Sequence, residues 1–163
     1  MLNLAINGFG RIGRITLRTI IENYRDRVRV TAINTSGSMD AAGWAHFLKY
    51  DTVYGRFGHE VSVLPPRMAS EIGRIRVDEE EYPVLAVREP ARIPWRDYEA
   101  ETVLECTGVF RDRQAEGHFE GGAKKVIISA PPKDEMIPTF VLGVNEEEYR
   151  GEKLISIGSC TTN

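Results

Sequence analysis

Cysteine is scarce in this sequence, since Cys106 and Cys160 are the only two among 163 residues. Two thiols cannot form a disulfide framework, so we expect reduced cysteines and a cytoplasmic protein. Long apolar runs are also lacking, because none reaches the roughly 18 residues that a membrane span needs. The first residues, MLNLAINGFGRIG, do not have the basic and then apolar layout of a secretory signal peptide.

A block of positive charge is missing as well. Lysine and arginine number 21 against 24 aspartate and glutamate residues, which leaves a net charge of −3. This mildly acidic balance argues against a protein that binds nucleic acid or a membrane surface by electrostatics. The sequence has no internal repeat, low-complexity tract or Gly/Ser linker. With 42% hydrophobic residues, its length suits one domain with a buried core.

The first fifty residues alternate between strand-like and helix-like segments. Short apolar runs at residues 2–6 and 28–33 predict strands. Apolar residues at nearly helical spacing predict a helix over 11–23, and Ser38 is placed to cap a second helix over 39–49. This β-α-β-α order is typical of a parallel sheet covered by helices. The residues of the second helix expected to face inward are Ala42, Ala45, Phe47 and Leu48.

The later β-type segments do not all follow that alternation. No helical pattern separates residues 59–64, 73–77 and 82–87, so we expect an antiparallel excursion from the main sheet. The predicted fold is α/β: a Rossmann-type doubly wound, mainly parallel sheet with this excursion. Four further segments are expected to be strands, the first two of them parallel to the main sheet: 102–106, 125–129, 139–142 and 154–156.

Residues 8–13 have the pattern G-x-G-x-x-G between the first strand and the first helix, a context typical of a dinucleotide-binding loop. Gly8 permits the tight turn out of the strand, Gly10 lets a pyrophosphate approach the backbone, and Gly13 lets the helix pack closely. The backbone N–H groups of Arg11 and Ile12 then lie at a helix N-terminus, which favours an anion. The alternative is a glycine-rich turn that binds no ligand.

The second strand leads into Asn34 and Thr35, where an NAD site commonly has an Asp or Glu that binds the ribose 2′-hydroxyl. Thr35 is neutral, and the next carboxylate, Asp40, is expected inside the following helix. Without that negative charge a 2′-phosphate is not repelled, and the hydroxyls of Thr35, Ser36 and Ser38 are able to donate to it. We therefore favour NADP, or use of both cofactors. The alternative is that NAD binds through its other contacts.

Cys160 follows a short apolar segment and Gly158, and a helix is expected to begin just after it. A cysteine at a helix N-terminus has a stabilised thiolate, which suits a nucleophile. The alternative is a small buried apolar residue, and that is the interpretation we give to Cys106. Nothing in the sequence brings a base to Cys160, and we interpret the three histidines as surface or packing residues: His46, His59 and His118.

Six motifs occur in an order that resembles the glyceraldehyde-3-phosphate dehydrogenase family: NGFGRIGR, LKYDTVYGRF, ECTGVF, GGAKKVIISAP, GVN and SCTTN. The resemblance covers nearly the whole chain, but only the N-terminal half of the family's chain. It implies a dinucleotide-binding domain over residues 1–155. It also implies the start of a catalytic domain at 156–163, with the remainder of that domain absent.

The resemblance implies a reaction of glycolysis and glucose metabolism, from glyceraldehyde 3-phosphate to 1,3-bisphosphoglycerate. Cys160 would attack the aldehyde to give a thiohemiacetal, hydride would pass to the nicotinamide, and inorganic phosphate would release an acyl phosphate from the thioester. The backbone N–H of Cys160 would donate to the oxyanion, and Ser159 and Thr161 match positions that contact substrate and phosphate. The match also places Arg11 and Ile12 at the pyrophosphate, Arg88 at the adenine, Thr107 and Gly108 along the cofactor cleft, and Ser129 on the nicotinamide side.

Three departures from the family pattern matter. Thr35 stands where many NAD-using members have Asp, which agrees with our preference for NADP. Ile157 and Gly158 replace the usual Asn-Ala pair before Ser159. The family's second half, with the histidine that activates the thiolate, is not in this sequence. We therefore expect no turnover by the chain alone, a complementary C-terminal half as partner, and a homotetramer when complete.

Other functions stay open at this point. Erythrose-4-phosphate dehydrogenase shares these motifs, and the residues that distinguish it lie largely in the absent half. A stand-alone dinucleotide-binding module that regulates a partner is a second possibility, although such a module has no need of SCTTN. Semialdehyde dehydrogenases are a third, but they lack this series of motifs.

Overall fold

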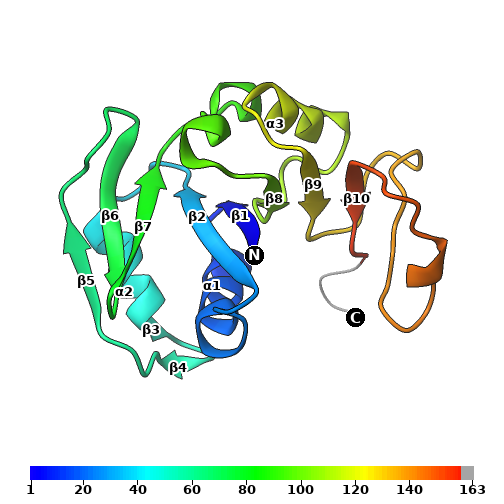
Figure 1. Ribbon diagram of the computed structural model, residues 1–163. Coiled ribbons are helices and arrows are strands. Elements are labelled where there is room, and N and C mark those ends of the chain that lie inside the picture. Colours follow the sequence, from blue (N-terminus) through cyan, green and yellow to red (C-terminus); the bar gives the residue numbers. More distant parts are fainter. Residues whose placement is uncertain (159–163) are drawn as a thin grey trace.

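The computed structural model describes residues 1–158, and an eight-stranded sheet runs through the centre of the molecule (Figure 1). Its strands are β1 (Leu2–Asn7), β2 (Val28–Asn34), β5 (Val61–Leu64), β6 (Glu71–Val77), β7 (Glu80–Leu85), β8 (Thr102–Glu105), β9 (Lys125–Ile128) and β10 (Leu154–Ser156). Their order across the sheet is β10-β9-β8-β1-β2-β7-β6-β5. A separate two-stranded ribbon is formed by β3 (Tyr50–Asp51) and β4 (Gly55–Arg56).

From β10 to β7 every neighbouring pair of strands is parallel, whereas β6 runs antiparallel to both β5 and β7. The predicted Rossmann-type sheet, mainly parallel with an antiparallel excursion, is therefore confirmed. β7, the last strand of the excursion, pairs antiparallel with β6 and parallel with β2. That pairing joins Ile33 to Val84 and Asn34 to Leu85.

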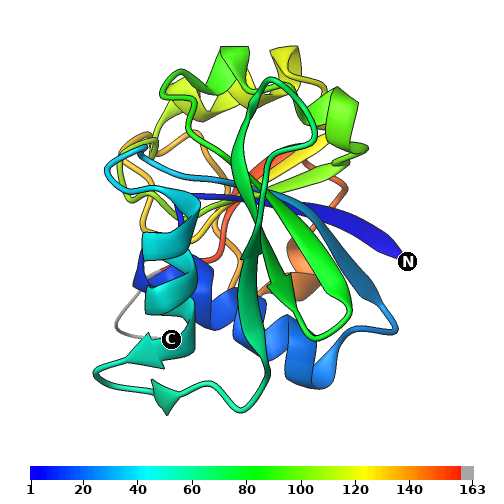
Figure 2. The ribbon, with the colours of Figure 1, turned by 90° about the vertical axis from the view of Figure 1, so that its left-hand side faces the viewer.

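Both faces of the central strands are buried, which explains why these strands are continuous apolar runs. Neighbouring residues of a strand point to opposite faces. Ala5 and Ala32 pack with Trp95 in one apolar cluster, while Ile6 and Ile33 belong to the cluster under the helices. Figures 1 and 2 show α1 (Arg11–Asn23) and α2 (Ala41–Lys49) on one side of the sheet. The opposite side is covered by η1 (Pro90–Arg92), η2 (Trp95–Tyr98), η3 (Arg113–Glu116) and α3 (Gly117–Glu120).

Helix α1 begins and ends at the predicted residues, and its buried face contains one charged side chain. The guanidinium of Arg18 donates to the carbonyl oxygen of Leu48 at 2.6 and 2.9 Å and to that of Gly55 at 3.2 Å. It also lies 5.0 Å from the centre of the Phe57 ring. Arg18 therefore joins α1 to the end of α2 and to β4 through four hydrogen bonds.

The start of helix α2 differs from the prediction. The helix begins at Ala41, and its N-cap is Asp40, whose Oδ1 accepts a hydrogen bond from Gly43 N at 2.8 Å. Ser38 is not the cap, and Asp40 is not inside the helix. The inward face is also partly different, because Phe47 is 44% exposed and Ala42 is exposed. The helical spacing i, i+3, i+4, i+7 instead buries Ala41, Trp44, Ala45 and Leu48.

The strand at 154–156 has the predicted bounds, the ends of the others shift by one or two residues, and one predicted strand is wrong. Residues 139–142 form no strand, since only Thr139 makes a bridge, to Ser156. The chain turns directly afterwards, where Val144 N donates to Val141 O at 3.0 Å and Gly143 has a φ of +81°. A single bridge beside β10 is too short for a ladder. The ribbon of β3 and β4 was not predicted, because its strands have two residues each.

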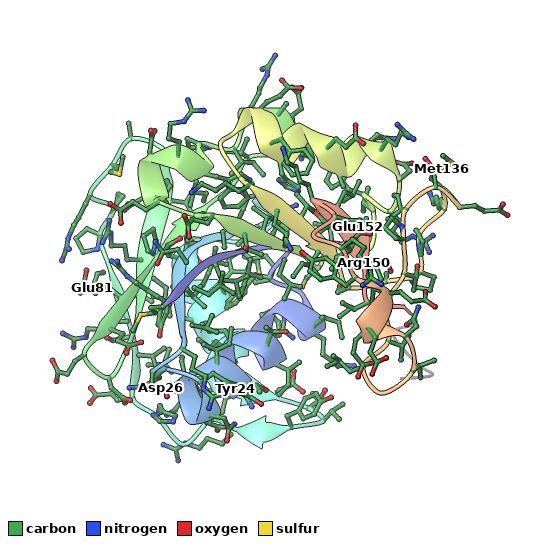
Figure 3. The ribbon with its side chains drawn as sticks, turned by 45° about the vertical axis from the view of Figure 1, so that its right-hand side comes forward. Tyr24, Asp26, Glu81, Met136, Arg150 and Glu152 are labelled. Atoms are coloured by element: carbon green, nitrogen blue, oxygen red, sulfur yellow. The ribbon has the colours of Figure 1, made fainter. Side chains whose placement is uncertain are left out.

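The segment between β9 and β10 leaves the sheet and returns to it. Figure 3 shows Met136 at the outer edge of this segment and Arg150 and Glu152 close to β10. Arg150 N donates to a carboxylate oxygen of Glu152 at 2.8 Å, just before the chain enters β10. Met136 is 74% exposed. Across residues 1–158, no helix combines the length and the apolar character required to cross a bilayer.

The N-cap of α2 yields a stability prediction. Asp40→Ala should lower the free energy of unfolding by about 1 kcal/mol, because it removes the acceptor for Gly43 N. Ser38→Ala, the matched control at the position expected from sequence, should change it by less than about 0.5 kcal/mol. Urea denaturation of the two variants measures the difference. A larger loss for Ser38→Ala would contradict this assignment of the cap.

Candidate functional site

A cavity of about 520 Å³ opens where β1, β2 and β8 end. The carboxyl ends of parallel strands are where open α/β sheets bind ligands. No Asp or Glu occurs among the described residues that line the cavity, so no lining side chain repels an anionic ligand. The lining residues are Asn7, Gly8, Phe9, Gly10, Asn34, Thr35, Ser36, Gly37, Ser38, Trp44, Val87, Arg88, Thr107, Val109 and Phe110.

The glycine loop lies at one wall of this cavity. Gly8 has a φ of +96°, and a Cβ there would lie 2.6 Å from the backbone nitrogen of Thr107. A Cβ on Gly13 would lie 2.2 Å from the carbonyl oxygen of Gly8. Gly10 is different, because a Cβ there meets no atom within 4 Å. The outer two glycines therefore permit close backbone packing, while the middle one borders open space.

The N-terminus of α1 follows this loop. Gly10 is its N-cap and supplies no side-chain cap, and the first turn contains no acidic residue. Helix geometry leaves the N–H groups of Arg11 and Ile12 without partners in the helix, so they are available to an anion. The side chain of Arg11 is turned outward, with Nε 3.9 Å from Asp51 Oδ2. Hydrogen bonds from the backbone N–H groups of Val53 and Tyr54 lower the pKa of Asp51 to about 2.

Asn34 lines the cavity and is almost fully buried. Its Nδ2 donates to Asn7 Oδ1 at 2.7 Å and to the carbonyl oxygen of Val87 at 2.8 Å. Its Oδ1 accepts from Val87 N at 2.9 Å. The side chain thus joins the ends of β1 and β2 to the loop after β7, the loop that also brings Arg88 to the cavity wall.

Thr35 lines the cavity as well, but its hydroxyl bonds the protein backbone and does not point to a 2′-phosphate as expected. Oγ1 donates to the carbonyl oxygen of Leu85 at 2.9 Å and accepts from Gly37 N at 3.2 Å. A hydroxyl has one donor, so Thr35 has none left for a 2′-phosphate in this arrangement. Ser36 and Ser38 are exposed, and Ser36 Oγ donates to Ser38 Oγ at 2.9 Å. Their hydroxyls remain at the cavity wall.

The other predicted cofactor residues are only partly brought together. Thr107 lines the cavity beside the glycine loop, and Gly108 continues the same turn with a φ of +70° but is not a lining residue. Ser129 lies just after β9, where its N–H donates to Glu105 O at 3.0 Å, away from the cavity wall. Arg11, Ile12 and Gly13 are the first residues of α1 and are not among the lining residues of the cavity.

Sequence reasoning missed a group of buried polar residues at and behind the cavity wall. Asn7, Glu105 and His118 are each 1% exposed or less, and their side chains lie within hydrogen-bond reach of one another. A signal was present, because a glutamate that ends the apolar run TVLE must find donors if that strand is buried. Periodicity could not show which donors those are.

Cys106 and the three histidines lie within the described residues, whereas Cys160 does not. Cys106 lies beside the apolar core, and burial raises the pKa of its thiol to about 12, as expected for an inert cysteine. His46 is exposed, His59 bonds Asp78 at 2.7 Å, and His118 is buried, so none of the three lines the cavity. The predicted nucleophile and its two neighbours lie outside the described residues: Ser159, Cys160 and Thr161.

Comparison with known proteins agrees with these features. The family model described as "Glyceraldehyde 3-phosphate dehydrogenase, NAD binding domain" matches residues 2–113. The glyceraldehyde-3-phosphate dehydrogenase of Bacteroides fragilis (strain YCH46) is 43% identical over all of this chain and 46% of its own length. The chloroplastic enzyme A of Chlamydomonas reinhardtii is 43% identical over 99% and 42%. The cytosolic enzyme of Chondrus crispus is 46% identical over 98% and 45%. The chain thus spans less than half the length of these relatives.

The packing of the glycine loop can be tested by two matched substitutions. Gly13→Ala should lower the free energy of unfolding by about 2 kcal/mol or more, because its methyl group overlaps Gly8 O. Gly10→Ala, with open space around it, should cost less than about 1 kcal/mol. Urea denaturation gives both values. Equal losses would contradict the close approach of α1 to the loop.

Proposed function

Because the chain belongs to the glyceraldehyde-3-phosphate dehydrogenase family and contains its NAD-binding domain, we propose that it is the dinucleotide-binding half of a phosphorylating aldehyde dehydrogenase. Its substrate would be glyceraldehyde 3-phosphate and its product 1,3-bisphosphoglycerate. The observation that carries the proposal is the carboxylate-free cavity, about 520 Å³ in size, between the glycine loop and the ends of β2 and β8.

The residues present fit a nicotinamide dinucleotide. The N–H groups of Arg11 and Ile12 would hold the pyrophosphate at the N-terminus of α1. The ends of β2 and β7, with Asn34 and Arg88, would border the adenosine half, and Thr107 would border the cleft on the other side. When bound, the nicotinamide supplies the acceptor for the hydride of the aldehyde.

We propose that the cofactor is NADP, or that both cofactors are used. The end of β2 has no carboxylate among the lining residues, so nothing there repels a 2′-phosphate. Ser36 and Ser38 supply hydroxyls at this wall, and the loop that they share is exposed. Because the Thr35 hydroxyl already donates to Leu85 O, we assign the expected contact with the 2′-phosphate to these two serines instead.

Titration of the chain with each dinucleotide by calorimetry tests this cofactor choice. The dissociation constant for NADP should be equal to or below that for NAD. Ser36→Asp should weaken NADP binding about tenfold, because a carboxylate then faces the 2′-phosphate. Ser36→Asn introduces a side chain of the size of Asp without its charge, so it should not weaken NADP binding in this way. A strong preference of the unmodified chain for NAD would refute the cofactor proposal.

The proposed chemistry takes place at Cys160, which lies outside the described residues. Its thiolate would attack the aldehyde carbon and form a thiohemiacetal, with the Cys160 N–H donating to the oxyanion. Ser159 and Thr161 would contact the substrate and inorganic phosphate. Loss of a hydride from that carbon, for which the bound nicotinamide would be the acceptor, and of the hydroxyl proton would convert the thiohemiacetal into a thioester. Phosphate would then attack the thioester carbon, release the acyl phosphate and return the thiolate.

The remaining parts of the proposal concern the rest of the protein. Residues 1–155 would be the dinucleotide-binding domain and 156–163 the start of the catalytic domain. A complementary C-terminal half would supply the histidine that activates Cys160, and the complete enzyme would be a cytoplasmic homotetramer. Its substrates would be the aldehyde phosphate and inorganic phosphate.

Activity and thiol labelling test the dependence on a second half. The chain alone should bind dinucleotide but show no aldehyde-dependent reduction of it. Iodoacetamide at pH 7 should label Cys160 slowly, and much faster after addition of the C-terminal half of the Bacteroides fragilis relative. Cys106 is the internal control, because its pKa near 12 keeps it protonated in both cases. Turnover by the pure chain, or unchanged labelling of Cys160, would refute this part of the proposal.

A further inference from the structure

A buried carboxylate beneath the cavity is surrounded by donors. Glu105, at the end of β8, is 1% exposed. Its Oε1 accepts from both the backbone N–H of Thr107, at 2.7 Å, and the hydroxyl of Thr107. Its Oε2 accepts from Asn7 Nδ2 and lies 3.0 Å from His118 Nε2. No lysine or arginine pairs with it among the described residues, so hydrogen bonds alone compensate its charge.

The direction of each of these hydrogen bonds is set by a further partner. Trp95 Nε1 donates to His118 Nδ1 at 2.9 Å, and an indole N–H can only donate. His118 therefore carries its proton on Nε2 and donates it to Glu105. Asn7 Oδ1 accepts from Asn34, so the Nδ2 of Asn7 must face the carboxylate.

The same argument holds at the other oxygen. The Thr107 amide is an N–H and can only donate, and Thr107 Oγ1 accepts from Val109 N at 3.1 Å while donating to Glu105. Four donors thus converge on one carboxylate, which has acceptor sites for all four. A side-chain amide of the same shape would leave at least one of these buried donors facing another donor.

Part of this network lies behind the cavity wall, and part of it forms the wall. Glu105 and His118 are not lining residues, whereas Asn7, Asn34 and Thr107 are. The Thr107 turn that Glu105 holds is also the backbone that Gly8 contacts, since a Cβ on Gly8 would be 2.6 Å from Thr107 N. The carboxylate thus determines the position of the turn where β8 meets the glycine loop.

We propose that Glu105 is the positioning residue of the dinucleotide site: it acts through Thr107, and His118 and Asn7 hold it in place. This inference rests on the proposed function, because it assigns the residue that shapes the site for the dinucleotide. The position of the Thr107 turn, and with it the affinity for the ligand, depends on an acceptor-only side chain at residue 105.

The first test compares two Glu→Gln substitutions at the two ends of β8. Glu105→Gln should weaken binding of NAD and NADP about tenfold, because a donor is left unpaired beneath the cavity. Glu101→Gln is the matched control. Glu101 immediately precedes β8 and pairs at the surface with Lys124 at 2.6 Å, so the loss of its charge should change affinity less than about twofold. Dinucleotide affinity is measured by calorimetry under conditions in which urea denaturation shows each variant to be folded.

A second measurement needs no ligand, and the signals that it follows would not change if Glu105 only filled space. In ¹⁵N NMR spectra, the ring nitrogens of His118 should show the Nε2–H tautomer, and Glu105→Gln should alter that pattern and shift the amide signal of Thr107. The chain has three histidines, and His46 and His59 serve as internal references. Unchanged His118 and Thr107 signals in Glu105→Gln would overturn the inference.

A pair of variants at His118 keeps the test decisive if Glu105→Gln does not fold. His118→Gln keeps a donor for Glu105, whereas His118→Leu removes it. Dinucleotide affinity should fall in the order unmodified chain, His118→Gln, His118→Leu. Equal affinities of the two variants would overturn the inference alone. If neither the unmodified chain nor Glu101→Gln binds any dinucleotide, the proposed function itself fails.

Discussion

The backbone of the glycine loop approaches its neighbours so closely that two of its positions have no room for a side chain. Gly8 lies against the Thr107 backbone, and Gly13 lies against the carbonyl oxygen of Gly8. These contacts bring the end of β1, the start of α1 and the end of β8 to one place. The cavity, the free N–H groups of α1 and the position of Thr107 all depend on this close approach.

Beneath this loop, a network of hydrogen bonds with fixed direction connects segments that are far apart in the chain. It runs from the Val87 backbone through Asn34 and Asn7 to Glu105. From Glu105 it continues to Thr107 and, through His118, to the indole of Trp95. Because every member has a defined donor or acceptor role, the network specifies one arrangement of the strand ends. We regard this as the means by which the sheet holds the site in shape.

The accuracy of the sequence-based prediction varied with the length and repetition of the signal. Helix α1 was predicted to the residue, because thirteen residues repeat one apolar face and follow a glycine loop. Helix α2 has nine residues, and both Ser38 and Asp40 are residue types that cap helices, so its start was wrong. The segment at 139–142 is apolar but turns away after one bridge, which a hydropathy pattern does not show. Motif order identified the family and the glycine loop, and with them much of the cavity wall.

The sequence by itself determined the parallel α/β architecture, the position of the loop and the absence of a carboxylate after β2. Each of these follows from residues that are neighbours in the chain. Only the tertiary structure decided that the Thr35 hydroxyl is used by Leu85 and that Glu105 supports Thr107. The reason is that a hydrogen bond depends on which groups meet in space, and Asn7 meets Glu105 across 98 positions of sequence.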